Sequence, residues 1–153
     1  RWKKGDFELR EVNDAQMGPC LELELKPQGE LNALTHEYVF LRLKQPATGP
    51  GPYGNAGVWV KGNGGWGEVQ FMVQGEKGSF RTGNIYYQSW SGQNAISFEG
   101  WNFLRYPLDH DQRWSGKGTV TGLLITMPRQ TLHLTGLKPV PELKIRLKGV
   151  SMF

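Results

Sequence analysis

Apolar and polar residues alternate along short runs of this chain, and glycine, proline, asparagine or aspartate closes each run. In "GEVQFMVQ", Val69, Phe71 and Val73 form one apolar face, and the side chains between them form a second, mostly polar face. A period of two residues is that of a half-buried β-strand, because successive side chains of a strand point to opposite faces. No stretch combines a sustained 3.6-residue period with a helix cap at its start. The sequence therefore predicts an all-β fold without long helices.

The spacing of these runs is typical of a β-sandwich or barrel. The runs are 7–12, 20–26, 37–44, 57–62, 67–74, 94–99, 101–108, 119–127, 131–134 and 142–152. The composition agrees, because 21 glycines supply turns, and the aromatic content, with six tryptophans, suits strands better than helices. The length of 153 residues is that of one domain, which we expect to span residues 1–153.

The charge and the apolar runs argue against a membrane partner and a nucleic-acid partner. The net charge is +4, a modest basic excess that is common on soluble surfaces and also favours polyanions. No apolar run approaches the roughly 18 residues needed to cross a bilayer, so we expect no membrane partner. The basic residues do not alternate with tryptophans along one strand, and no RRM-type or KH-type motif is present. We therefore expect no nucleic-acid partner.

Two tryptophans fall where the alternation turns side chains away from the core. In "GVWVKG", Val58 and Val60 share the core face, which sends Trp59 to the opposite face. The "NGG" that follows favours a tight reversal, so strands 57–62 and 67–74 are predicted to be antiparallel neighbours. The non-core face of this pair would then carry Trp59, Lys61, Trp66, Glu68 and Gln70.

A face of this composition is what sugar recognition requires. The C–H side of a pyranose ring stacks on an aromatic plane, and its hydroxyls pair with amide, carboxylate or guanidinium groups. Arg42, which alternates with the apolar Val39 and Leu41, would join this face. The basic residues Lys61, Arg42 and Arg105 favour an acidic glycan over a neutral one. The alternative is that a single β-bulge turns a tryptophan inward, where it fills the core.

Catalytic motifs are absent from the sequence. "DHD" (109–111) is the densest titratable cluster and fits a surface turn, because no HExxH, CxxC or GxSxG motif accompanies it. A glycosidase would need two facing carboxylates among Glu68, Glu99, Asp109 and Asp111. A jelly-roll lyase would use His36, Tyr38 and Arg42. We keep a small lyase or hydrolase as an alternative and expect that the chain is not an enzyme.

Three segments, "GVWVKGNGGWGEVQFMV", "AISFEGWNFLRYPL" and "ELKIRLKGVSMF", follow one another in a recognisable order. In this layout a Gly-Trp pair, Gly100–Trp101, opens a strand that runs into Tyr106–Leu108. Over about residues 37–153 the chain resembles a galactose-binding-domain-like β-jelly roll, the fold of many carbohydrate-binding modules attached to polysaccharide-degrading enzymes. The resemblance implies an all-β sandwich of two antiparallel sheets.

The resemblance also implies where a ligand would bind. If the site is a sheet face, its residues are Trp59, Lys61, Glu68 and Gln70. If the site is at the loop tips, its residues are Tyr53, Trp90 and Trp114. Members of the group often carry a structural calcium, for which Asp6, Glu8 or Asp14 would serve, although no EF-hand loop is present.

The resemblance finally implies a role for the whole module. It would bind a polysaccharide or oligosaccharide and hold a covalently attached catalytic domain there, as part of a secreted or cell-surface protein. The alternative from another class is a structural β-sandwich that packs against a catalytic domain through a flat apolar patch and binds no sugar.

Overall fold

A computed structural model describes residues 2–26, 36–48, 54–63, 67–82, 96, 98–126 and 143–153. Strands dominate this part of the chain, with one 3-10 turn. The elements are β1 (Trp2–Lys4), β2 (Asp6–Asp14), β3 (Gly18–Lys26), β4 (His36–Ala47), β5 (Asn55–Asn63), β6 (Val69–Gly75), β7 (Gly78–Arg81), β8 (Glu99–Pro107), η3 (Leu108–His110), β9 (Gly118–Thr126) and β10 (Lys144–Met152). No helix in these ranges is long and apolar enough to cross a membrane.

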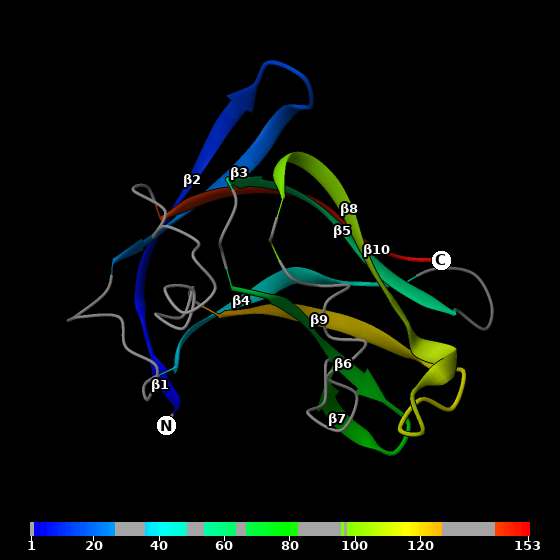
Figure 1. Ribbon diagram of the computed structural model, residues 1–153. Coiled ribbons are helices and arrows are strands. Elements are labelled where there is room, and N and C mark those ends of the chain that lie inside the picture. The colour runs from blue at the N-terminus through cyan, green and yellow to red at the C-terminus, as the bar shows by residue number, and fades with distance from the viewer. Residues whose placement is uncertain are drawn as a thin grey trace.

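The strands form two five-stranded sheets that pack face to face (Figure 1). Sheet A has the order β1-β4-β9-β6-β7, and sheet B has the order β2-β3-β10-β5-β8. Within the described ranges every strand pair is antiparallel except β1 with β4, which is parallel. The predicted all-β sandwich is confirmed, with this one parallel pair as the departure from two purely antiparallel sheets.

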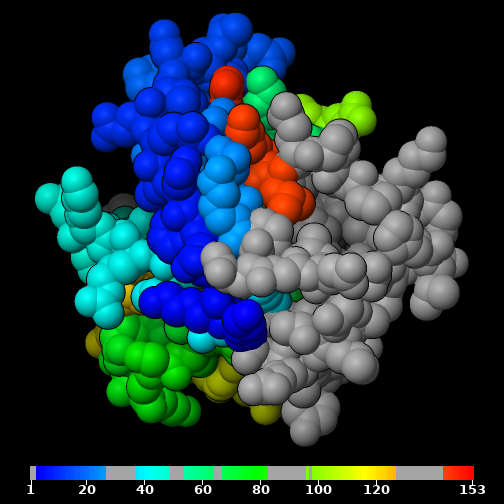
Figure 2. Space-filling view, turned by 90° about the vertical axis from the view of Figure 1, so that its left-hand side faces the viewer, coloured from blue at the N-terminus to red at the C-terminus, as the bar shows by residue number. Residues whose placement is uncertain are grey.

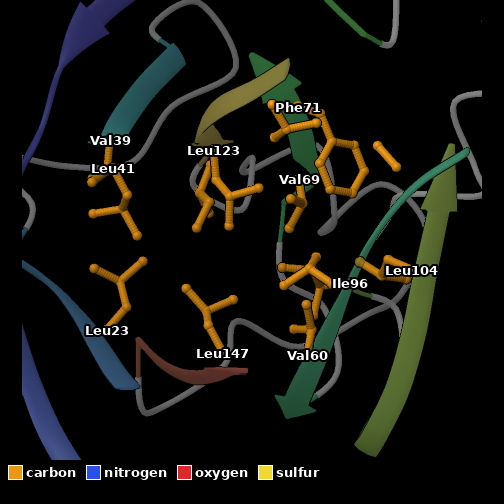
Figure 3. Packing of buried hydrophobic residues seen from close by; sticks show 14 of the residues in the cluster. Leu23, Val39, Leu41, Val60, Val69, Phe71, Ile96, Leu104, Leu123 and Leu147 are labelled. Atoms are coloured by element: carbon orange, nitrogen blue, oxygen red, sulfur yellow. The ribbon is translucent and has the colours of Figure 1, made fainter. Parts of the chain in front are cut away.

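One hydrophobic core lies between the sheets (Figure 3). Val39, Phe71 and Leu123 of sheet A face Val60 and Leu147 of sheet B, and all are buried. The alternation predicted the orientations of Val39, Phe71 and Val60, because a period of two fixes which side chains share a face. The confirmed core faces include Val58 with Val60 on β5 and the alternating apolar residues of β6.

The predicted hairpin between 57–62 and 67–74 is wrong. β5 pairs with β10 and β8 in sheet B, whereas β6 pairs with β9 and β7 in sheet A. The chain therefore crosses from one sheet to the other between Asn63 and Val69. The two strands have the expected core faces, but they bury them from opposite sides of the sandwich. A period of two fixes which side chains share a face, but it does not show which strands are neighbours. The glycine-rich turn does not show this either, because such a turn can join two strands of one sheet or strands of two different sheets.

Smaller differences concern elements too short to show a pattern. β1 and β7 have three and four residues and were not predicted. The predicted surface turn 109–111 lies partly in a 3-10 turn, η3. The predicted run 94–99 contributes only its last residue to β8, and the run 131–134 lies outside the described residues.

A buried carboxylate links the tip of the β2–β3 hairpin to the rest of sheet B. Asp14 is 3% exposed, and its Oδ2 accepts hydrogen bonds from Arg146 Nη1 at 2.8 Å and Lys61 Nζ at 3.0 Å. Its Oδ1 accepts from Trp101 Nε1 at 3.0 Å and from the Gln16 amide at 2.9 Å. Figure 2 shows β2 and β3 in blue beside β10 in orange-red, the arrangement that this carboxylate joins.

The same contacts set the protonation of Asp14. Burial by itself raises the pKa of a carboxyl group, because the charged form loses solvation. Here the hydrogen bonds from the Gln16 amide, Lys61, Arg146 and Trp101 outweigh burial and hold the pKa of Asp14 well below its ordinary value of 3.8. The carboxylate is therefore ionised across the ordinary pH range.

We expect Asp14→Asn to lower the melting temperature, because the substitution leaves Lys61 and Arg146 without their shared carboxylate. Since the pKa of Asp14 is lowered in the folded chain, its contribution to stability is complete well above pH 3.8 and is lost as the pH falls below that value. Thermal unfolding followed by circular dichroism, from neutral pH into acid, should show a gap between variant and parent that narrows below about pH 4. Glu99→Gln, at an exposed position of β8, is the control. An Asp14→Asn variant as stable as the parent at neutral pH would contradict the prediction.

Candidate functional site

Three aromatic rings form a continuous row on the outer face of sheet B. The ring centroids of Trp59 and Phe103 are 5.3 Å apart, with the planes tilted by 51°. The centroids of Phe103 and Phe153 are 5.7 Å apart, with the planes tilted by 41°. The three side chains are 39%, 37% and 49% exposed, respectively. We call Trp59, Phe103 and Phe153 the aromatic row.

The strand register brings these rings together. Trp59 of β5 lies opposite Phe103 of β8, so the two side chains are cross-strand neighbours. Phe103 then reaches across β5, because Gly57 has no side chain in its path: a Cβ there would overlap the Phe103 ring. Two backbone hydrogen bonds between Asn55 and Phe153, of 3.0 and 3.1 Å, fix the third residue of the row beside β5.

Polar groups lie on both sides of the aromatic row. Arg105 of β8 lies opposite Gly57, and its Nη1 donates a hydrogen bond to Asn55 Oδ1 at 3.1 Å. Asn55 Nδ2 in turn donates to the carbonyl of Phe153 at 3.4 Å. On the other side, Lys148 of β10 lies opposite Trp59, and its ammonium group contacts the carbonyl of Met17.

The sheet face predicted from the sequence is divided between the two outer faces of the sandwich. Trp59 and Lys61 lie outside sheet B, as the alternation predicted, but the Lys61 ammonium group is bound to Asp14. Glu68 and Gln70 belong to β6 and its flank, on sheet A. Gln70 is only 5% exposed, and its Nε2 donates to Glu68 Oε1 at 3.2 Å. The prediction that these residues share one face is wrong, because β5 and β6 are not neighbours.

Arg42 also lies on the outer face of sheet A. It is exposed on β4, opposite Gly122 of β9, and Gly122 is opposite Met72 of β6 in the same row. Arg42 is therefore on the face of Gln70 and away from the aromatic row.

Of the residues predicted at the loop tips, the structure describes only Trp114. Trp114 packs against the core, and its ring lies so close to Gly118 that a Cβ there would be 2.8 Å from a ring carbon. Trp114 thus has a packing role and does not stand free at a loop tip. Tyr53, Trp66 and Trp90 lie outside the described residues, so their predicted roles stay predictions.

The residues proposed for calcium do not form one site. Asp6 and Asp14 lie at opposite ends of the nine-residue strand β2, about 26 Å apart at the usual rise per residue. Glu8 contributes to ion pairing with Arg10, at 3.9 Å, and Asp14 is surrounded by hydrogen-bond donors. Within the described ranges no group of three or more His, Cys, Asp and Glu side chains is placed to hold a metal. Asp6, Glu8 and Asp14 therefore do not come together as one site, and the expected calcium stays a prediction.

The "DHD" segment has a structural role. Asp111 accepts hydrogen bonds from Tyr106 Oη at 2.9 Å and from Arg113 Nη2 at 2.7 Å, and the Arg113 guanidinium lies 4.6 Å from the centroid of the Phe80 ring. Burial opposes ionisation, but the bonds from Arg113 and Tyr106 outweigh it and lower the pKa of Asp111. Burial and the neighbouring carboxylate raise the pKa of Tyr106 to about 12. Asp111 is therefore ionised, and it links Tyr106 of β8 to Arg113, whose guanidinium packs on Phe80 of β7. A general acid has to be protonated before it reacts, so Asp111 does not fit that role.

Phe103 and Phe153 are not among the site residues that the sequence predicted. Both faces of the run 101–108 are apolar enough to be ambiguous, and Phe153 follows the last predicted strand. Only the pairing of β5 with β8 and β10 brings these two rings beside Trp59. This pairing joins residues far apart in the sequence, so no local pattern indicates it.

Comparison with known proteins agrees with the architecture. No protein-family model matches the sequence, and no curated protein matches it. Among solved structures, the chain is similar to a family 11 carbohydrate-binding module of a cellulosomal cellulase from Clostridium thermocellum, with a TM-score of 0.52 and 6% identity over 97% of this chain and 82% of that chain. A family 11 module from Clostridium thermocellum in complex with a β-1,3-1,4-mixed-linked tetrasaccharide matches with a TM-score of 0.49 and 9% identity over 97% and 83%. At this identity the first match shows a shared β-sandwich fold, as the sequence layout predicted.

We expect Gly57→Ala to disrupt the aromatic row. A methyl group at residue 57 would overlap the far end of the Phe103 ring, which is 37% exposed and so can turn away from β5. NMR contacts between the rings of Phe103 and Phe153 should therefore disappear, and urea unfolding shows whether the displaced ring changes stability.

Gly75→Ala on β6 is the matched control, because the nearest atoms to a Cβ there are 3.5 Å away or more. The prediction fails if the ring contacts persist in both alanine variants.

Proposed function

We propose that this chain is a non-catalytic carbohydrate-binding module that binds a polysaccharide or oligosaccharide along the aromatic row. The observation that carries the proposal is the contact between three exposed rings, Trp59, Phe103 and Phe153, on the face of a sheet. Large aromatic side chains are normally buried, and a contiguous exposed set marks a binding surface.

The geometry of the row favours one form of glycan. The planes of neighbouring rings are tilted by 51° and 41°, so the row is not a flat platform. A flat crystalline surface would need coplanar rings, whereas a single chain whose sugar units turn relative to one another follows tilted ones. Arg105 beside the row supplies hydrogen-bond donors for hydroxyl oxygens at the edge of the sugar ring.

The state of the carboxylates supports a binding role without catalysis. Hydrolysis of a glycosidic bond commonly needs two carboxyl groups, one of which is protonated at the start. Four carboxylates on the outer face of sheet B, Glu8, Asp14, Glu22 and Glu24, form ion pairs, whereas Glu99 of β8 is exposed. The shared fold with a carbohydrate-binding module points the same way.

The proposed biological role is to keep an attached polysaccharide-active enzyme on its substrate. Linking the two converts a bimolecular encounter into an intramolecular one and raises the effective concentration of substrate. This role requires a secreted or cell-surface protein, which is part of the proposal.

Affinity gel electrophoresis against a panel of neutral and acidic polysaccharides tests the proposal. The parent should be retarded by at least one glycan, and Trp59→Ala and Phe103→Ala should each weaken binding about tenfold, since a ring stacked on a ligand contributes about 1–2 kcal/mol. Leu21→Ala is the control, because Leu21 is 37% exposed on β3 and lies outside the row. Circular dichroism shows whether each variant is folded.

Two results would overturn the proposal. If no glycan retards the parent, the aromatic row is instead a surface that packs against another domain. If a glycan retards the parent and both row variants equally, the binding site lies elsewhere, and the outer face of sheet A with Arg42 and Gln70 is the next place to search.

A further inference from the structure

We infer that the ligand of the aromatic row is an anionic glycan, whose acidic groups bind to Arg105 on one edge of the row and to Lys148 on the other. This inference rests on the proposed function and adds the chemical class of the ligand. It comes from the distribution of paired and unpaired charges on the outer face of sheet B.

Most cations on this face are neutralised by a neighbouring carboxylate. Each has a carboxylate oxygen within 4.0 Å, and two of them, Arg10 and Arg146, have more than one carboxylate partner. These pairs are Lys61 and Arg146 with Asp14, Arg146 with Glu22, Arg10 with Glu22 and Glu24, and Lys26 with Glu24. Together they occupy the part of the face formed by β2, β3 and the adjoining ends of β5 and β10, which we call the ionic half.

The two cations beside the aromatic row differ from these. Arg105 donates to the neutral amide oxygen of Asn55, and Lys148 contacts the carbonyl of Met17. Neither has a carboxylate within ion-pair distance among the residues that the structure describes. Both therefore keep an uncompensated positive charge.

The register places these two charges on opposite sides of the row. Arg105 on β8 lies opposite Gly57, and Lys148 on β10 lies opposite Trp59, so β5 runs between them. A glycan stacked on Trp59 and Phe103 would have the Arg105 guanidinium along one edge, and the Lys148 ammonium group, beside the Met17 carbonyl, on the side of the β2–β3 turn. Its acidic substituent would find donors on either edge.

Asn55 prepares Arg105 for this role. Its side chain accepts from the guanidinium and donates to the carbonyl of Phe153, so it ties the cation to the end of the row. One Arg105 nitrogen is engaged in this way, and the other N–H groups are left for a ligand. The planar fork of a guanidinium matches the two oxygens of a carboxylate, and such charge-assisted pairs are stronger than neutral hydrogen bonds.

Two kinds of glycan carry the required anion: uronates have a ring carboxylate, and sulfated glycans have a sulfate ester. The fork geometry of Arg105 favours the uronate. The experiment uses both as separate probes so that the source of the anion is decided by measurement.

The test is isothermal titration calorimetry of the full chain with oligogalacturonate, a sulfated galactan oligosaccharide and a neutral β-glucan oligosaccharide of similar length. We expect the anionic probes to bind more tightly than the neutral one. Arg105→Gln should weaken their binding about tenfold, the scale of one lost charge-assisted hydrogen bond. Raising the salt concentration should weaken it further. Lys44→Gln, which removes one exposed positive charge from β4 of sheet A, should leave affinity unchanged.

The outcomes separate this inference from the function on which it rests. Tight binding of only the sulfated probe supports an anionic ligand and identifies sulfate as its acidic group. If the neutral probe binds best, with loss in Trp59→Ala but not in Arg105→Gln, the proposed function stands and the inference is wrong. Equal loss in Arg105→Gln and Lys44→Gln would also overturn it, because the attraction would then be non-specific. If no probe binds, both proposals fail.

Discussion

The carboxylate of Asp14 is in contact with groups from most of sheet B. The residue itself ends β2, and its partners Arg146, Lys61 and Trp101 come from β10, β5 and β8. A buried charge is costly unless it is paired and fully hydrogen-bonded, so strands that moved relative to one another would lose this compensation together. The interaction therefore holds the register of four strands, including the two that carry Trp59 and Phe103.

The same carboxylate separates the outer face of sheet B into two regions. In the ionic half the charges cancel locally, and their field falls off over a short distance. Beside the aromatic row the charges of Arg105 and Lys148 are left without such compensation. Trp101 lies at the boundary, because its indole N–H is bound to Asp14 while its strand continues to Phe103. An approaching anion would thus be attracted to one end of the face and not to the other.

The sequence predicted which way side chains point on each strand, but it did not predict which strands pair with one another. Val58 and Val60 indicated that Trp59 points outward, because a period of two is a local property of the backbone. The pairing of β5 with β8 and β10 involves residues far apart in the chain, and the glycines after Asn63 favoured a nearer partner that proved wrong. Gly57 shows the same limit: its role depends on the Phe103 ring that lies over it, and no local pattern indicates that ring.

The direction of the aromatic row has a mechanical consequence. Trp59 and Phe153 lie at levels of β5 separated by Gly57, so the row runs roughly along that strand. In the proposed complex, tension on a bound chain would act along β5. The β5–β8 register extends over nine residue pairs, from Asn55 with Pro107 to Asn63 with Glu99, and its hydrogen bonds are perpendicular to the strands. Such a load would shear many bonds at once instead of opening them one after another, which is the stronger of the two arrangements.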